Sequence, residues 1–423
     1  MWDVILLSVK LKLVVVTLAI SVSFTPLAHA QSSELSSGSS SWGSSGGNDG
    51  PVHSSSRISP GLDVTMIGDL LGPGITEHID VLAGDLGQMV PLNENGEFAI
   101  IFGDSFRGKE LGQGEWLSPV GVVAKVVDGR IRIIRPLNDG ERARQLIDYQ
   151  HNDRGLTLLP SDIINIGGTL YMQAMWNEGI GNVLSTQIWS STDNGKTWDS
   201  VVTLPKDFMG GMGNLITWEN GPDGYIYMMS SQFKRTDDVY LTRFKPEDIG
   251  SPSLWQHYSH GAWGKKYSPV LSRNVQAGEM CLRFIEGHWV LSMFNANNLS
   301  IEIRIADEIT ADWEAIPPAK VVVTGTGGWA AEQGPNNFTQ LYGGYIVPGS
   351  TLSNMDLVVS QWNTSTNKRY NSTQFNAKGL DKFFGIKQPQ PELSDPSLEV
   401  VQEEPTDYSQ PAPMRIVPLK DAT

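Results

Sequence analysis

A unit consisting of a turn and a strand of large apolar residues recurs five times along this chain. Its copies begin at Gly96, Gly168, Gly224, Gly287 and, more loosely, Asn354. Successive copies are 72, 56, 63 and 67 residues apart. Such spacing suits a small sheet of four short strands with its loops, repeated around a ring. The recurrence therefore predicts an all-β fold, a five-bladed β-propeller.

The predicted blades span residues 82–135, 156–204, 213–258, 275–323 and 335–376. In the last four blades the innermost strand is expected at 157–160, 214–218, 275–281 and 337–341. A single β-sandwich is the rival fold, but it does not explain a five-fold recurrence. Helical periodicity is confined to 138–149 and to a turn at 246–250.

An eight-residue segment from Ser191 to Trp198 fits the Asp-box pattern S-x-D-x-G-x-T-W. In this turn the Asp193 carboxylate is expected to accept backbone N–H bonds, with Gly195 at a positive φ and Trp198 packed inward. Such boxes lie at the outside of blades, so we assign Asp193 a structural role.

The two ends of the chain differ in composition from its body. Residues 1–30 resemble an export signal, because Lys10 and Lys12 precede an apolar run and Ala28 and Ala30 form a small-x-small cleavage pattern. A membrane anchor is the alternative, although polar residues and Pro26 interrupt the run. Residues 31–56 form a Ser/Gly-rich linker, residues 57–385 the propeller domain and residues 386–423 a Pro-rich acidic tail. We expect a mature chain without a membrane span, either secreted or at the cell surface or in the periplasm.

Overall composition narrows the class of partner. With 31 basic and 46 acidic residues the chain carries a net charge of −15, which disfavours nucleic acids and anionic lipids. The single cysteine, Cys281, excludes an internal disulfide and reads as a buried thiol. The 13 Trp and 11 Tyr residues suit a sugar-binding cleft as well as a core. No zinc pattern, phosphate-binding loop or nucleophile elbow is present in the sequence, so we expect no metal or cofactor. We also expect the protein to be a monomer.

Two aspartates flank a predicted hairpin in the first blade. Apolar runs at 89–92 and 98–102 are joined by turn residues, with Asp85 before the first run and Asp104 after the second. The ends of an antiparallel pair meet, so both acids can face one cleft although they are 19 positions apart. Facing carboxylates of this kind perform glycoside hydrolysis. The alternative is that both are turn aspartates that bond to their own backbone.

The two acids differ in their predicted roles. Phe102 and Phe106 should desolvate Asp104 and raise its pKa, so we expect Asp104 to be the general acid and Asp85 the base or nucleophile.

Two further acids lie at the ends of predicted inner strands. Asp162 follows Pro160 in the second blade, where it either faces the ligand or is a turn residue. Glu279 follows Gly278 in the fourth blade, where it either faces the ligand or lies at an exposed edge. We predict that both bind substrate or set the pKa of the catalytic acids.

Five segments together resemble the family known as domain of unknown function 4185, which includes endo-acting D-arabinanases. They lie at 65–70, 83–87, 102–106, 278–280 and 342–348. The resemblance implies a five-bladed propeller that cleaves α-linked D-arabinofuranose chains of arabinogalactan and lipoarabinomannan, with Asp85 and Asp104 as the catalytic aspartates. We also predict Tyr342 and Tyr345, in the last segment, as substrate-binding residues.

Two other functions stay open at this stage. A non-catalytic polysaccharide-binding propeller would bind arabinan without releasing new reducing ends. A sialidase-like hydrolase is suggested by the Asp box, but that chemistry needs an arginine cluster and a nucleophilic Tyr. Residues 57–60 also fail to match the usual opening motif of such enzymes.

Overall fold

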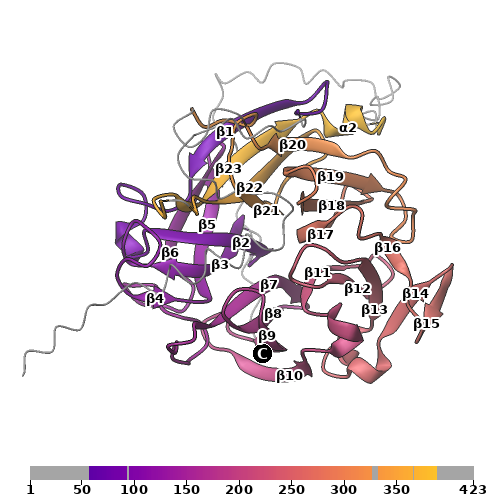
Figure 1. The fold of residues 1–423 in the computed structure, drawn as a ribbon, viewed down its shortest axis with the longest axis horizontal. Coiled ribbons are helices and arrows are strands. Elements are labelled where there is room, and N and C mark those ends of the chain that lie inside the picture. Colours follow the sequence, from indigo (N-terminus) through magenta and orange to yellow (C-terminus); the bar gives the residue numbers. More distant parts are fainter. Residues whose placement is uncertain (1–56, 93–94, 326–331, 365, 388–423) are drawn as a thin grey trace, which may run out of the picture.

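The computed structural model describes residues 57–92, 95–325, 332–364 and 366–387, and these form five antiparallel sheets arranged in a ring (Figure 1). The predicted five-bladed β-propeller is confirmed. Each inner strand lies beside the inner strands of the two neighbouring blades, around the central axis of the ring. These inner strands are β2 (Ala83–Pro91), β7 (Leu156–Ile166), β11 (Leu215–Asn220), β17 (Ala277–Ile285) and β21 (Leu341–Ile346).

Each blade continues outwards from its inner strand. The first blade adds β3 (Glu97–Phe106), β5 (Val120–Val127) and β6 (Arg130–Pro136), with β4 (Trp116–Leu117) on the end of β3. The second adds β8 (Thr169–Glu178), β9 (Val183–Ser191) and β10 (Asp199–Pro205). The third adds β12 (Ile226–Ser231), β13 (Val239–Phe244), β14 (Gln256–Ser259) and β15 (Ala262–Gly264), with β16 (Pro269–Leu271) on β13. The fourth adds β18 (His288–Asn295), β19 (Ser300–Ala306) and β20 (Ala319–Val323).

The fifth blade is built from both ends of the folded body. It contains β21, β22 (Asn354–Trp362) and β23 (Tyr370–Lys378), and its outermost strand is β1 (Asp63–Asp69). The expectation that residues 335–376 supply the whole blade was therefore incomplete. Because β1 pairs antiparallel with β23, it fastens the beginning of the ring to its end. The closure also covers what would otherwise be an unpaired strand edge.

Helical structure is sparse among the described residues. The short helices are η1 (Glu77–Ile79), η2 (Phe208–Gly211), η3 (Pro246–Asp248), η4 (Pro252–Leu254) and α2 (Leu380–Phe383). The turn expected at 246–250 is thus present as η3, whereas the helix expected at 138–149 was wrong. That segment is a chain of turns, since Asp139 and Gly140 take positive φ and separate backbone bonds tie Ala143 and Leu146 to other loops.

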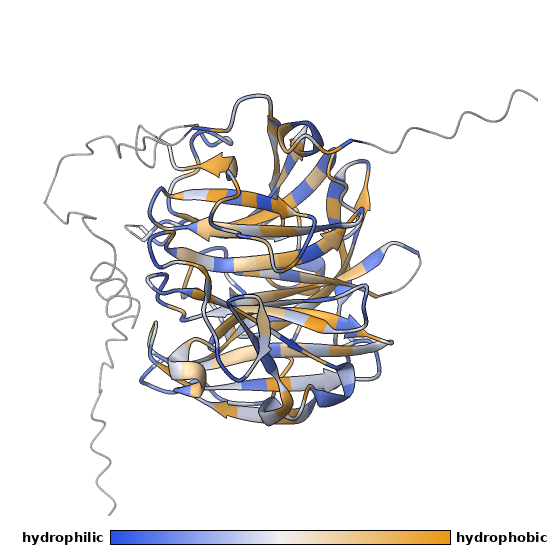
Figure 2. Ribbon diagram, turned by 90° about the vertical axis from the view of Figure 1, so that its right-hand side faces the viewer, coloured by the Kyte–Doolittle hydropathy of each residue, from blue (hydrophilic) through white to orange (hydrophobic). Residues whose placement is uncertain are grey.

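The hydrophobic core fills the layers between neighbouring blades. In β3, Ile100 packs towards the fifth blade and the next residue, Ile101, packs towards the second blade. Because both faces of such a strand are covered, its sequence is a continuous apolar run rather than an alternation. Three tryptophans, Trp218, Trp255 and Trp313, are fully buried in these layers. In Figure 2 the hydrophobic residues lie mainly along the strands.

The predicted Asp box forms the turn between β9 and β10. Asp193 accepts hydrogen bonds from the backbone N–H groups of Lys196 and Thr197, both at 3.0 Å. Partial burial would raise the Asp193 pKa, but the bonds from Thr197 and its neighbours lower it to about 2. Gly195 has φ +86°, and a Cβ there would lie 2.6 Å from Leu137. The box lies at the end of the second blade opposite to the start of its inner strand.

The predicted signal and linker lie outside the described residues, as does the tail beyond Lys387. Among the residues that are described, no helix has the length and apolar character needed to cross a membrane.

Candidate functional site

Asp85 and Asp104 lie at the same end of the first blade. They are inside β2 and β3 rather than just outside them, because both strands are longer than the apolar runs suggested. The pairing of β2 with β3 is irregular here, since Gly84 pairs with Ser105 but Leu86 pairs with Phe102. The irregularity leaves both carboxyl groups outside the regular register of the hairpin.

Glycines make room for this arrangement. A Cβ at Gly103 would lie 2.7 Å from Oδ1 of Asp85 and 2.8 Å from the Leu86 side chain. A Cβ at Gly84 would lie 2.8 Å from Oγ of Ser105. A larger residue at Gly103 would therefore displace the Asp85 carboxyl group, and one at Gly84 would displace the Ser105 side chain next to Asp104.

Asp85 is a buried carboxyl group with few hydrogen bonds. Its side chain is 9% exposed, and Oδ2 accepts a hydrogen bond of 2.8 Å from the Tyr342 hydroxyl. No described residue donates a hydrogen bond of normal geometry to Oδ1. Burial and then the charge of Asp104 raise the pKa of Asp85 to about 7, although the hydroxyls of Tyr342 and Tyr370 act to lower it. Asp85 therefore keeps its proton to a much higher pH than an ordinary carboxyl group and is about half protonated at neutral pH.

Asp104 is better supplied with donors. Its Oδ1 accepts hydrogen bonds from Nε1 of Trp116 at 2.9 Å and from Oγ1 of Thr157 at 2.6 Å. Burial raises the pKa of Asp104, and the bonds from Thr157 and Trp116 oppose that rise. Donors that bond to a carboxylate favour its charged form. Asp104 and Trp116 are only half-buried, so this acid reaches solvent.

The Trp116 ring is held by two other rings. His151 stacks on it with centroids 3.7 Å apart and planes 9° apart, and Phe106 stacks at 6.4 Å and 15°. His151 is itself anchored, because its ring nitrogens lie 2.7 Å from the Leu156 carbonyl oxygen and 3.1 Å from that of Trp116. These contacts fix the direction of the indole N–H towards Asp104.

Glu279 joins the two aspartates from the fourth blade. It is 4% exposed, so its placement at an exposed edge was wrong. Its Oε1 accepts a hydrogen bond of 2.6 Å from Nη2 of Arg235, whose guanidinium lies 5.5 Å from the centre of the Tyr342 ring. The charge of Glu279 contributes to the raised pKa of Asp85. We call Asp85, Asp104 and Glu279 the acidic cluster.

A glycine pair explains why two tyrosines of β21 face the interior. Residues three apart on a regular strand point to opposite faces. At Gly343 and Gly344, which have φ of +80° and +113°, the pairing of β21 with β22 shifts register between Gly343 and Tyr345. The shift lets Tyr342 reach Asp85 while the Tyr345 hydroxyl accepts a bond from Gln88 at 3.4 Å.

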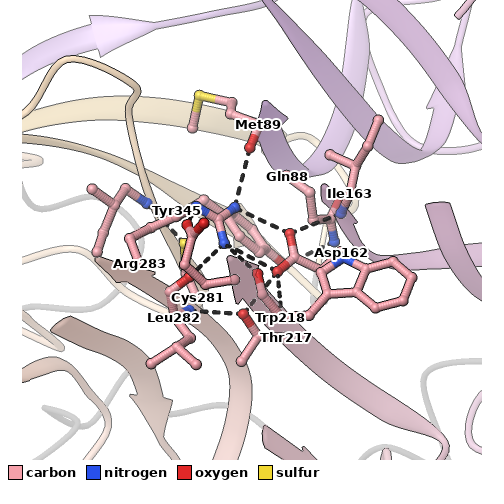
Figure 3. Close-up of polar contacts among 12 residues, drawn as sticks. Gln88, Met89, Asp162, Ile163, Thr217, Trp218, Cys281, Leu282, Arg283 and Tyr345 are labelled. Atoms are coloured by element: carbon pink, nitrogen blue, oxygen red, sulfur yellow. Dashed lines mark hydrogen bonds and ion pairs between the residues drawn. The ribbon is translucent and has the colours of Figure 1, made fainter. Parts of the chain in front are cut away.

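Asp162 and Tyr345 lie in a separate buried network (Figure 3). Asp162 is within β7 and not in a turn; its two oxygens pair with Nη1 and Nη2 of Arg283, both at 3.1 Å. It also accepts bonds from Thr217 Oγ1 at 2.7 Å and from the Trp218 N–H at 3.1 Å. Asp162 and Tyr345 are each 1% exposed. The structure thus gathers Asp85, Asp104, Glu279 and Tyr342 and pairs Asp162 with Arg283 instead. Tyr345 lies between the two groups, since burial and then the charges of Glu279 and Asp85 raise the pKa of its phenol.

Several residues of the site carried no signal in the sequence. Arg235 lies in the loop between β12 and β13 with φ +61°, far from any motif. Trp116 reaches Asp104 from β4, which pairs with β3 in the same blade, whereas Thr157 and Tyr370 come from the neighbouring blades. Thr157 could have been found, since it begins a predicted inner strand.

Comparison with known proteins places the chain in a family. The domain of unknown function DUF4185 matches residues 72–376. An uncharacterized 35.9 kDa protein in the asd 3′ region of Mycolicibacterium smegmatis is 30% identical over 294 residues, covering 62% of this chain and 83% of that protein.

A solved structure shares the fold. A hydrolase candidate from Bacteroides ovatus ATCC 8483 has a TM-score of 0.53 at 12% identity, over 74% of this chain and 90% of that one. An exo-β-1,3-galactanase from Clostridium thermocellum has a TM-score of 0.47 at 12% identity, over 74% of this chain and under two thirds, 61%, of that one. At such identities the likeness is one of fold alone. The match over residues 72–376, in contrast, confirms the resemblance seen in the sequence: the chain belongs to the DUF4185 family.

Proposed function

We propose that this protein is a glycoside hydrolase that cleaves internal α-D-arabinofuranosidic bonds of cell-wall D-arabinan. One observation carries the proposal. Two carboxyl groups, one buried and one half-buried, lie at the same end of one hairpin; the pKa of Asp85 is raised to about 7, whereas two hydrogen bonds to Oδ1 of Asp104 oppose the rise of its pKa. A neutral acid beside a carboxylate is the pair that glycoside hydrolysis uses. The choice of D-arabinan rests on the resemblance to family members with that activity.

The structure favours roles opposite to those expected from the sequence. Asp85, with a pKa of about 7, is suited to donate its proton to the leaving glycosidic oxygen. Asp104, whose Oδ1 accepts two hydrogen bonds, is suited to act as the carboxylate that deprotonates water or attacks the anomeric carbon. Phe102 and Phe106 do not distinguish the acids, because both carboxyl groups are desolvated.

The surrounding residues have supporting roles in this proposal. Glu279 helps to keep Asp85 protonated by its charge, and Arg235 holds the Glu279 side chain in place through the bond to Oε1. Tyr342 orients Asp85 and borders the sugar bound there. Asp162 and Tyr345, predicted as substrate contacts, would act through the shape of the centre of the ring. We further propose that the protein acts outside the cytoplasm, in keeping with the predicted signal at 1–30.

Digestion of purified D-arabinan tests the proposal directly. We expect new reducing ends and a ladder of oligosaccharides on chromatography, with Asp85→Asn and Asp104→Asn each lowering the rate by about 10³-fold or more. Asp193→Asn, which removes a carboxylate outside the site, is the matched control and should retain activity. Binding without new reducing ends would instead favour the non-catalytic propeller, and release of free arabinose alone would exclude internal cleavage.

A sialidase-like activity finds less support. Recognition of an acidic sugar by such an enzyme uses a cluster of arginines. Arg235, the arginine that contacts the described acidic cluster, is already paired with Glu279.

A further inference from the structure

A pocket of about 240 Å³ lies beside the acidic cluster, between the end of β1 and the beginning of β23. Its lining includes Leu71, Lys109, Lys368, Arg369 and Tyr370. Tyr370 links the two places, because its ring lies edge-on to Phe106 with centroids 5.9 Å apart, and Phe106 stacks on the Trp116 ring that binds Asp104. A molecule in the pocket would therefore lie next to the bond-cleaving carboxyl groups.

The pocket is positively charged although the chain has a net charge of −15. The charges of Asp69 and Arg369 cancel each other, since the Arg369 guanidinium donates to both carboxylate oxygens of Asp69 at 2.7 Å. The Arg369 Nε is also occupied, by Oε1 of Gln361 at 2.7 Å. Lys109 and Lys368 remain, and neither forms an ion pair with any acid of the described residues. Lys109 and Lys368 are thus exposed cations in the pocket lining that no acid of the described residues neutralises by an ion pair.

The walls of the pocket are fixed in advance. Asn371 donates to the Leu71 carbonyl oxygen at 2.8 Å and accepts from the Leu71 N–H at 3.4 Å, which joins β23 to the chain after β1. Thr76 bonds to Gly72 at 3.0 Å and to Val81 at 2.6 Å and so closes the neighbouring loop. A preformed wall lowers the entropy lost when a ligand binds.

We propose that this pocket is a subsite for an anionic group, a carboxylate or phosphate, carried by the polysaccharide next to the bond that is cleaved. Lysine ammonium groups bind such anions as point charges, whereas a neutral sugar can accept hydrogen bonds from them but gains no attraction between opposite charges. The inference rests on the proposed function, because it assigns the pocket to the same glycan chain. It extends that function from neutral arabinan to arabinan with acidic substituents.

A first experiment tests the anion site without a glycan. The amide NMR spectrum of the full chain is followed during titration with inorganic phosphate and with succinate, at low ionic strength. We expect shifts at Leu71, Gly72 and Tyr370 that vanish in Lys109→Gln/Lys368→Gln. The control Lys206→Gln/Lys266→Gln changes the net charge equally but lies outside the pocket lining, and it should keep them. Shifts that are absent, or that survive in the pocket variant, overturn the proposal.

A second experiment asks whether the anion belongs to the glycan. Binding of D-arabinan lightly modified with succinic anhydride is compared with binding of untreated D-arabinan, in an Asp85→Asn background that prevents cleavage. We expect the succinylated chain to bind about threefold to tenfold more tightly, with the difference lost in the pocket variant and at high salt. Equal binding of both chains would assign the pocket to free small anions and overturn the glycan subsite. Failure of the wild type to cleave untreated D-arabinan would count against the hydrolase alone, since the phosphate titration does not depend on cleavage.

Discussion

At the scale of the residue, Asp85 is a carboxyl group whose charge the fold disfavours. Its pKa rises from 3.8 to about 7 on folding, so the native state binds more protons than the unfolded state between these values. The contribution of Asp85 to the free energy of unfolding is then fully present below about pH 4. It is lost as the pH rises through 7, and the loss is at most about 4 kcal/mol. Asp85→Asn removes this dependence, and we expect it to raise Tm at pH 8 while abolishing hydrolysis. Thermal unfolding at pH 5 and pH 8 measures the effect.

Asp193 provides a comparison of opposite sign. Its pKa falls to about 2, so its stabilising contribution is present above about pH 4 and is lost as the pH falls towards 2. Asp193→Asn should lower Tm at pH 7, because the Asp-box turn loses a charged acceptor. If Asp85→Asn and Asp193→Asn shifted Tm at pH 8 in the same direction, the buried-charge account of Asp85 would be wrong.

The Tyr342 hydroxyl tunes the same acid. It donates to Asp85 at 2.8 Å and thereby lowers the pKa of that carboxyl group. If Asp85 is the general acid, kcat/KM declines above its pKa, and Tyr342→Phe should move this alkaline limb to higher pH. The pH profile of kcat/KM for both proteins decides the point. A limb that stays in place, or moves to lower pH, would return the acid role to Asp104.

At the scale of the element, β1 holds the ring closed. It pairs with β23 from Asp63 to Asp69, and Asp69 binds the Arg369 guanidinium at its end. Removing residues 1–56 should leave Tm almost unchanged, whereas removing residues 1–70 exposes the edge of β23 and should lower Tm by about 10 °C or more, or abolish folding. Calorimetry of the two truncated chains makes the comparison, and equal Tm values would show that the closure contributes little.

The sequence predicted those elements that depend on residues close together in the chain, and it missed those that depend on distant residues. Turn-and-strand units are local, so the five blades and the hairpin with Asp85 and Asp104 could be found from patterns of a few residues. The pairing of β1 with β23 joins positions about 300 apart, and no local pattern encodes it. Arg235 likewise reaches Glu279 only through the packing of its loop, and Trp116 reaches Asp104 only through the pairing of β4 with β3.

At the scale of the whole molecule, a network of polar contacts at the centre of the ring joins all five blades. Arg283 of the fourth blade donates to Asp162 of the second at 3.1 Å, to the Met89 carbonyl oxygen of the first at 3.1 Å and to that of Trp218 of the third at 3.4 Å. The fifth blade joins through Ile346, whose N–H lies 3.3 Å from the buried sulfur of Cys281. This network lies at the centre of the ring, where the inner strands meet. It therefore fixes the positions of the five blades relative to one another.

Removing the cation at its centre should loosen the ring without changing the chemistry. Arg283→Met leaves the Asp162 carboxylate buried and unpaired, which we expect to cost about 3–5 kcal/mol of unfolding free energy. Adding Asp162→Asn removes that charge and should recover part of the loss, so the two changes are not additive. Arg154→Met breaks the exposed pair with Glu178 and serves as the control, at less than about 1 kcal/mol.

Denaturant unfolding gives these values, and kcat/KM measured well below Tm should change little, because Arg283 contacts none of the acidic cluster. An additive double variant would show that the pair does not act as a unit, and a large loss of kcat/KM would show that the network shapes the catalytic end of the ring.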